Sequence, residues 1–210
     1  MERINPFKPL TGALLAIALF TGCGDPPAGI RPLPPTATVL AFGDSLTRGK
    51  GARQSESYPS QLADLLGVSV INEGISGEES DEGLNRLPDL LDRYRPNLVL
   101  LCHGGNDFLR LRDKKGTHAN LRKMIQHCRD SGADVILIAV PDPGLTLSPP
   151  GLYKALASEF AIPLEADIMT TVISDKSLLS DHVHPNATGY RHIAEALAKT
   201  IRAAEAGAHP

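Results

Sequence analysis

Three residue types that together can hydrolyse an ester bond occur near the two ends of this sequence. Ser45 follows a short apolar run, in Gly43-Asp44-Ser45-Leu46, and Asp181 lies three positions before His184. A serine hydroxyl becomes a nucleophile when an imidazole accepts its proton and a carboxylate orients that imidazole. We therefore predict that Ser45 is the nucleophile, that His184 is its base, and that Asp181 holds the histidine.

Simpler explanations exist for each of these residues. Ser45 could do no more than cap the turn in which it lies, and an Asp-x-x-His spacing alone arises easily by chance. His182 is the local alternative to His184, and we interpret it as a solvent-facing or supporting residue. Thr47 stands where the Gly-x-Ser-x-Gly motif of an α/β-hydrolase has its last glycine, so the sequence disfavours that fold.

The elements that must position these residues are indicated by the pattern of apolar residues. Apolar runs predict strands over 39–42, 68–71, 98–102 and 135–140, with a short fifth strand over 162–164. Helical spacing predicts helices over 59–66, 79–94, 118–130, 152–160 and 186–202. Pro88 lies within the second of these helices and is expected to split or kink it.

The order of these elements indicates where a site would lie. Strands that alternate with helices indicate an α/β layer fold, and continuous apolar strands indicate a parallel sheet covered on both faces. In such sheets ligands bind beyond the carboxyl ends of the strands. Ser45 follows the first strand, and glycine-rich turns over 74–77 and 104–107 follow the second and third. The three turns are therefore expected to converge on one edge of the sheet.

Four segments carry a resemblance to a known family. They are Ala41–Thr47, Asn72–Gly77, His103–Asp107 and Asp181–Asn186. They match, in order, the sequence blocks of the SGNH (GDSL) hydrolase superfamily. From about residue 39 to residue 201, the chain resembles the bacterial thioesterase I, lysophospholipase L1 and arylesterase branch of that superfamily.

The resemblance implies a fold and a set of further site residues. The fold is a three-layer α/β/α sandwich with a flavodoxin-like parallel sheet, and the oxyanion hole consists of the Ser45 N–H, the Gly77 N–H and the Asn106 side chain. Glycine allows close backbone approach, and an amide donor stabilises charge that develops in the transition state. Turn chemistry is the alternative for Gly77 and Asn106. Asp44 and Asp107 are expected to tie down loop backbone.

The resemblance implies neither a metal nor a cofactor. A zinc site made of His103, His182 and His184 would lack any carrying motif. His103 is also a departure from the family, because close thioesterase relatives tend to have an apolar residue there. Segments that line the acyl site in the family are a Pro-rich stretch over 141–150 and the stretch before Asp181, which is short here. Phe108, Leu109 and Leu111 follow Asn106 and either contact an acyl chain or belong to a docked loop or helix start.

The first residues are typical of export. Arg3 and Lys8 precede a mostly apolar stretch over 10–21, which is too short to span a membrane and suits a signal peptide. Cys23 follows in a context that resembles a bacterial lipobox. We predict a signal peptide over 1–22 and lipidation of Cys23. An ordinary secretory signal with an incidental cysteine, or an uncleaved anchor, is the alternative.

The remaining organisation follows from this assignment. Residues 23–36 hold the lipidated cysteine and a Pro-rich tether, residues 37–204 form the hydrolase domain, and residues 205–210 form a tail. The protein is then expected to be a membrane-anchored lipoprotein that faces the periplasm. Gly24 after Cys23 favours the outer membrane.

Composition restricts the other partners. The net charge is −3, the aromatic content is 4%, and tryptophan is absent. Neither a basic surface for a phosphate backbone nor an aromatic platform for bases is indicated, so we expect no nucleic-acid partner. Cys102 and Cys128 fall on apolar faces, and we favour two buried thiols over a disulfide.

The features together predict a serine hydrolase that cleaves carboxylic ester or thioester bonds through an acyl-enzyme. Small-molecule acyl esters, including aryl esters, acyl thioesters and lysophospholipids, are the expected substrates. One alternative is an O-deacetylase of carbohydrate or cell-envelope glycan. Another is a binding lipoprotein that keeps the scaffold without catalysis.

Overall fold

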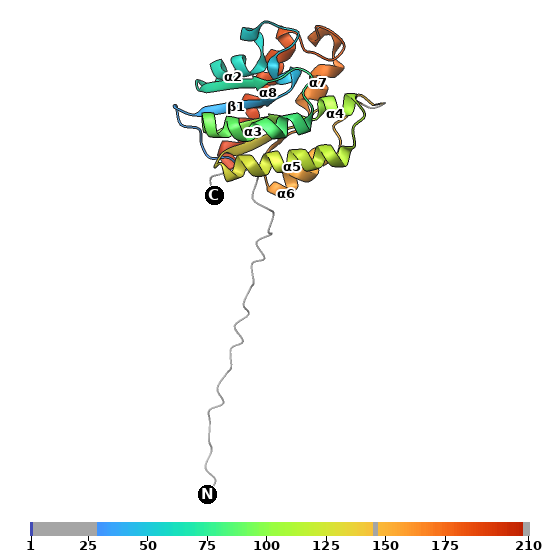
Figure 1. Ribbon diagram of the computed structural model, residues 1–210. Helices are drawn as coiled ribbons and strands as arrows, with labels where there is room; N and C mark the ends of the chain where they lie inside the picture. The colour runs from blue at the N-terminus through green and yellow to red at the C-terminus, as the bar shows by residue number, and fades with distance from the viewer. Residues whose placement is uncertain (2–28, 145–146, 208–210) are drawn as a thin grey trace.

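The computed structural model describes residues 1, 29–144 and 147–207. Within them, one sheet of five parallel strands has the order β2-β1-β3-β4-β5 (Figure 1). The strands are β1 (Thr38–Gly43), β2 (Ser69–Gly74), β3 (Leu98–Cys102), β4 (Asp134–Ile138) and β5 (Leu164–Glu165). This is the predicted α/β arrangement, and the continuous apolar character of β1, β3 and β4 is explained by burial along nearly their whole length.

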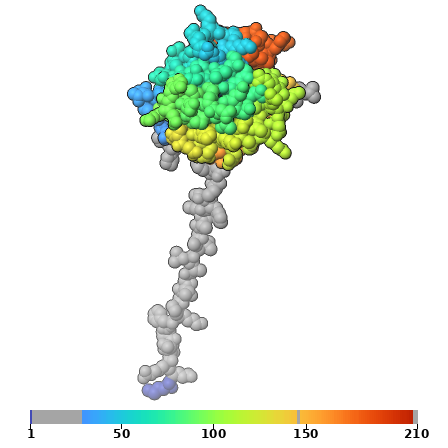
Figure 2. Space-filling view, in the orientation of Figure 1, coloured from blue at the N-terminus to red at the C-terminus, as the bar shows by residue number. Residues whose placement is uncertain are grey.

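Helices cover both faces of the sheet. They are α1 (Ser45–Arg48), α2 (Tyr58–Leu66), α3 (Ser80–Tyr94), α4 (Gly105–Leu109), α5 (Lys114–Asp130), α6 (Leu152–Phe160), α7 (Ile168–Ser174) and α8 (Ala187–Gly207), with 3₁₀ turns η1 (Gln54–Glu56) and η2 (Lys176–Leu178). The helices α2 and α8 pack together on one side of β1, and α3 and α5 pack together on the other (Figure 1). The side chains of α3 and α5 form a continuous surface over the near face (Figure 2). The three-layer sandwich is therefore confirmed.

The predicted break at Pro88 does not occur. The helix α3 runs without interruption from Ser80 to Tyr94, with Pro88 inside it. A proline removes one helical hydrogen bond, but Leu87, Leu90 and Leu91 beside it are buried in the core. Tertiary packing of this apolar stripe, rather than local propensity, holds the helix together.

Other element boundaries differ from the predictions by a few residues. The helix α5 begins at Lys114 rather than at 118 because the Asp113 side chain caps it, accepting from the Lys115 N–H at 3.1 Å. The strand β5 is shifted to Leu164–Glu165, and α8 continues to Gly207. The short helices α1, α4 and α7 were not predicted.

The described end of the expected tether packs against the domain. Ile30 is buried, and its N–H donates to the Ala204 carbonyl of α8 at 3.2 Å. The Leu33 N–H donates to Glu205 Oε1 at 2.8 Å, and Arg31 pairs with Asp134 at the start of β4. This contact lies at the amino ends of the strands, opposite the glycine-rich turns, and it accounts for the extra length of α8.

Some predictions fall on residues outside the described part of the chain. These are the signal peptide over 1–22, the lipidation of Cys23 and the last residues of the tail, 208–210. None of the described helices combines the length and the apolar character that a membrane crossing requires. Cys102 and Cys128 are buried free thiols, as predicted, and burial raises the pKa of Cys128 to about 12.

Candidate active site

Ser45, His184 and Asp181 form one chain of hydrogen bonds at the carboxyl edge of the sheet. The Ser45 Oγ lies 3.0 Å from His184 Nε2, and His184 Nδ1 lies 2.7 Å from Asp181 Oδ2. Ser45 begins α1 directly after β1, whereas the other two residues come from the loop that precedes α8. The structure therefore brings together the three residues that the sequence selected from opposite ends of the chain.

A tight turn brings the Asp181 carboxylate back to the imidazole three residues later. Asp181 Oδ1 accepts the Val183 N–H at 2.9 Å and the His184 N–H at 2.8 Å, which leaves Oδ2 for the ring. The Val183 N–H, with the hydrogen bonds from His184, holds the pKa of Asp181 well below its usual range. His182 is exposed, in agreement with its predicted role.

The turn that presents Ser45 depends on close packing of two strand ends. A Cβ at Gly43 would lie 2.1 Å from the Cys102 carbonyl of β3, so only glycine fits between β1 and β3. The Asp44 side chain then caps α1 by accepting the Leu46 N–H at 3.0 Å. Burial raises the pKa of Asp44. Asp44 thus ties down the loop backbone, as predicted.

Gly77 and Asn106 line the same cavity as Ser45 and His184. Gly77 lies in the turn between β2 and α3 with φ +84°, a left-handed conformation that favours glycine. The Asn106 Nδ2 donates to the Glu78 carbonyl at 2.9 Å and to Asp44 Oδ2 at 3.2 Å. Both residues therefore lie on the wall of the cavity that holds the Ser45–His184 contact.

The cavity has a volume of about 160 Å³, and most of its wall is apolar. Contact with an acyl chain was one of two alternatives for the three apolar residues after Asn106, and of these only Leu109 lines the cavity. Phe108 is buried edge-on against Tyr153, and Leu111 is 92% exposed. Side chains from the Pro-rich segment also contribute, and the apolar wall consists of Leu46, Leu109, Val140, Pro141, Pro143, Leu147, Ile173 and Val183.

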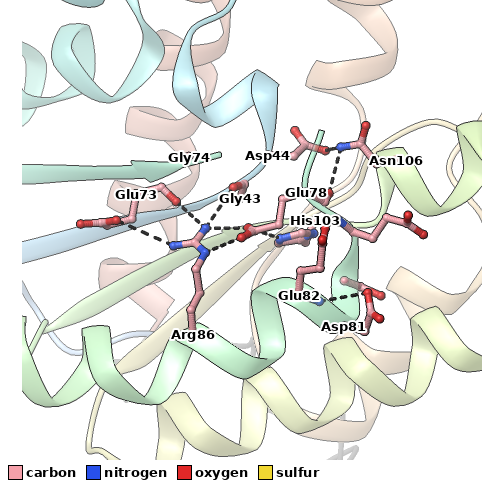
Figure 3. Close-up of polar contacts among 12 residues, drawn as sticks. Gly43, Asp44, Glu73, Gly74, Glu78, Asp81, Glu82, Arg86, His103 and Asn106 are labelled. Carbon is pink, nitrogen blue, oxygen red and sulfur yellow. Dashed lines mark hydrogen bonds and ion pairs between the residues drawn. The ribbon is translucent and has the colours of Figure 1, made fainter. Parts of the chain in front are cut away.

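Sequence reasoning missed a group of titratable side chains next to Gly77 and Asn106. The Glu78 carboxylate is buried between Arg86 and His103 (Figure 3). From the sequence, His103 was considered only as a departure from the family and as a ligand of a zinc site that lacks a carrying motif. Among the described residues, no three His, Cys, Asp or Glu side chains are arranged to hold a metal ion.

A parallel α/β sandwich that carries a Ser–His–Asp chain and an apolar cavity at its carboxyl edge defines a hydrolase of the esterase type. Residues 41–192 match the model of the GDSL-like Lipase/Acylhydrolase family. The chain belongs to this family, the SGNH hydrolases, and it is an enzyme that hydrolyses ester bonds.

Characterised relatives agree with this assignment. An arylesterase of Vibrio mimicus is 36% identical over 174 residues, which cover 78% of this chain and 87% of the relative. The thioesterase 1/protease 1/lysophospholipase L1 of Escherichia coli (strain K12) is 34% identical over 173 residues, 79% of this chain and 83% of that protein.

A solved structure shows the same fold. The psychrotrophic esterase EstA from Pseudoalteromonas sp., inhibited by monoethylphosphonate, aligns with a TM-score of 0.73 at 27% identity, covering 80% of this chain and 97% of EstA.

Proposed function

We propose that the enzyme cleaves carboxylic ester or thioester bonds through an acyl-enzyme on Ser45. The Ser45 Oγ attacks the carbonyl carbon while His184 Nε2 takes its proton. The tetrahedral intermediate collapses, and the leaving alcohol or thiol takes that proton. Water then attacks the acyl-enzyme with His184 again as base, releasing the acid and restoring Ser45. The observation that carries this proposal is the unbroken chain of 3.0 Å and 2.7 Å contacts from Ser45 through His184 to Asp181.

The tetrahedral oxyanion needs donors on the side of Ser45 away from His184. We assign this role to the Ser45 N–H, the Gly77 N–H and the Asn106 side chain. Support comes from the shared cavity wall of these residues. The Asn106 amide already uses one hydrogen on the Glu78 carbonyl, so an oxyanion would replace its longer, 3.2 Å bond to Asp44. One such donor contributes about 3–4 kcal/mol to transition-state stabilisation.

The size of the cavity favours small acyl groups or aryl groups. Its 160 Å³ is close to the volume of about 150 Å³ in which an engineered apolar cavity holds benzene. Most of its lining is apolar, which suits a hydrocarbon or ring rather than a charged group. Aryl esters and short-chain acyl esters or thioesters are therefore preferred over long-chain lysophospholipids.

We also propose that the enzyme is a periplasm-facing lipoprotein anchored at Cys23. The sequence around Cys23 supports this proposal. The chain enters the domain at Ile30, at the amino ends of the strands, whereas the cavity lies at their carboxyl ends. Metabolic labelling with palmitate tests the anchor, and a Cys23→Ser protein that still carries lipid refutes it.

The test of the hydrolase proposal uses the full chain, its Ser45→Ala variant and a Glu159→Gln control. Glu159 pairs with Arg122 on the surface. Aryl esters of increasing acyl length, acyl thioesters and acetylated sugars form the substrate panel. We expect turnover to be fastest on short aryl esters, to disappear with Ser45→Ala and to persist in the control.

Three outcomes would contradict parts of this proposal. Preference for acetylated sugars would assign a glycan O-deacetylase instead. Equal rates for the wild type and Ser45→Ala across the panel would leave only a binding function. A fluorophosphonate probe that labels another residue would refute Ser45 as nucleophile.

A further inference from the structure

A second carboxylate–histidine pair consists of Glu78 and His103, and Arg86 of α3 contacts its carboxylate (Figure 3). The Glu78 carboxylate accepts Arg86 Nε at 2.5 Å and Arg86 Nη2 at 2.6 Å, and its Oε2 lies 3.0 Å from His103 Nε2. Glu78 is 5% exposed and His103 is fully buried. Removing such groups from water is costly unless each is paired, so the arrangement demands a specific reason.

Arg86 connects this pair to the strand ends below the active site. Its Nη2 donates to the Glu73 carbonyl of β2 at 2.9 Å and, at 3.4 Å, to the carbonyl of Gly43, the residue before the Asp44-Ser45 turn. Its guanidinium lies 4.2 Å from the ring centroid of Phe42 in β1. The Glu78 side chain is thereby fixed to the two strands that end at the site.

The backbone of Glu78 connects the pair to the proposed oxyanion hole. Its carbonyl accepts Asn106 Nδ2 at 2.9 Å, and its nitrogen belongs to the peptide that follows Gly77. One residue therefore adjoins two of the three proposed donors. A rotation of this backbone would move the Asn106 amide and the Gly77 N–H together, and such displacements are costly to a catalytic geometry.

We propose that Glu78, clamped by Arg86 and His103, is the positioning residue of the oxyanion hole. The clamp holds the Glu78 carbonyl in place, and this carbonyl orients the Asn106 amide toward the carbonyl oxygen of the substrate. Glu78 does not touch the reacting atoms. The inference rests on the proposed function, because it concerns the donors assigned to that reaction.

The surroundings of His103 favour a ring that is held in one orientation and donates a hydrogen bond from Nε2 to Glu78. Its Nδ1 meets no hydrogen-bond partner among the described residues, so the neutral form with the proton on Nε2 satisfies the pair without burying an unpaired N–H. Gly83 of α3 makes room for the ring, because a Cβ there would lie 2.5 Å from His103 Nε2. The imidazole therefore acts as a rigid support for the carboxylate.

The test compares Glu78→Gln with Glu159→Gln in the full chain. The same charge is removed in both variants, but Glu159 pairs with Arg122 far from the cavity. We expect Glu78→Gln to lower kcat on a short aryl ester about 10- to 100-fold, with KM within about two-fold of the wild-type value. A fluorophosphonate should still label Ser45 completely, but at a rate reduced in parallel with kcat. The control should match the wild type.

A second pair of variants tests the inference without altering Glu78. Glutamine at position 103 can still donate an N–H to Glu78, and leucine cannot, so His103→Gln should keep kcat within about three-fold while His103→Leu loses about 10-fold.

The proposal is overturned if Glu78→Gln keeps the wild-type kcat, or if the two His103 variants have the same kcat. It is also overturned if the fall in kcat of Glu78→Gln is fully accounted for by the fraction of protein in which the fluorophosphonate does not label Ser45. Failure of the proposed function is distinct from these outcomes, since wild type would then be no faster than Ser45→Ala.

Discussion

The two carboxylate–histidine pairs at the carboxyl edge of the sheet differ in what the second imidazole nitrogen meets. His184, held by Asp181, directs Nε2 at the Ser45 hydroxyl on the cavity wall. His103, which contacts Glu78, is fully buried, and its Nδ1 has no partner among the described residues. The residue types are nearly the same. A general base needs a free lone pair that faces a reacting proton, and only the first pair offers one.

The carboxylates of the two pairs differ as well. Asp181 is half exposed, and backbone N–H groups lower its pKa. Burial alone would raise the pKa of Glu78, but the hydrogen bonds from His103 and Arg86 outweigh burial, so its pKa lies below the ordinary value. Each carboxylate is thus kept ionised at neutral pH, Asp181 by backbone N–H groups while in contact with solvent, and Glu78 by the hydrogen bonds from His103 and Arg86. The comparison assigns one carboxylate–histidine pair to catalysis at the cavity wall and the other to positioning of the oxyanion hole.

The largest expected effect comes from replacing the histidine of each pair with glutamine and comparing the two variants. His184→Gln removes the base and should lower kcat about 10⁵- to 10⁶-fold, as in other serine hydrolases that lose a member of the triad. His103→Gln keeps a donor for Glu78 and should change kcat little. Steady-state kinetics on a short aryl ester measures both. Equal losses would show that the buried histidine also takes part in proton transfer.

Removing the charge of each carboxylate should give the next largest difference. Asp181→Asn leaves His184 without its acceptor and favours the wrong tautomer, so kcat should fall about 10³- to 10⁴-fold. Glu78→Gln should cost less, because the base and nucleophile remain in place. The ratio of the two kcat values is the measurement. A smaller loss for Asp181→Asn than for Glu78→Gln would reverse the roles assigned here.

The Asp181–His184 pair on the cavity wall could be predicted from sequence because its geometry is local. Asp181 and His184 are separated by three residues, and one turn closes the contact between them. Ser45 was identifiable because a glycine-rich turn followed an apolar strand, and parallel strands bring such turns to one edge. The strands were correct to within a few residues for the same reason, since their apolar runs are continuous.

The buried Glu78–His103 pair could not be predicted because its contacts depend on tertiary packing. Glu78 and His103 are 25 residues apart, and they meet only where the start of α3 packs against the end of β3. Two signals were nevertheless present, a histidine at the end of an apolar strand and Gly83 inside a helix. The short helices α1, α4 and α7 were missed because they are too brief to show a helical period.

A smaller effect concerns how stability depends on pH. Because the pKa of Glu78 is lower in the folded state, its contribution is fully present above the ordinary glutamate pKa of about 4.5 and is lost as pH falls through the folded value. Glu78→Gln should therefore lower the free energy of unfolding by about 1–3 kcal/mol at pH 7, and by less in acid. Urea denaturation from pH 7 to pH 3 measures this difference.

The matched variant for this pH series is Asp181→Asn. Since the Asp181 side chain is 47% exposed, solvent screens its interactions, and its effect on stability should be smaller than that of Glu78→Gln. A pH-independent difference between wild type and Glu78→Gln would mean that the buried carboxylate does not gain its stability from ionisation.

A further effect on stability, of about the same size as that of Glu78→Gln, tests the space that the Glu78–His103 pair requires. Alanine usually stabilises a helix relative to glycine by about 0.5–1 kcal/mol, and Gly116→Ala in α5 should do so, because no atom outside its own helix lies within 4 Å of the added Cβ. Gly83→Ala should instead destabilise by about 1–3 kcal/mol, because its Cβ would displace the His103 ring. Opposite shifts in the urea midpoint would show that the ring is held firmly against α3. If both alanines stabilise, the ring can move aside without cost, and it cannot be the rigid support that orients Glu78.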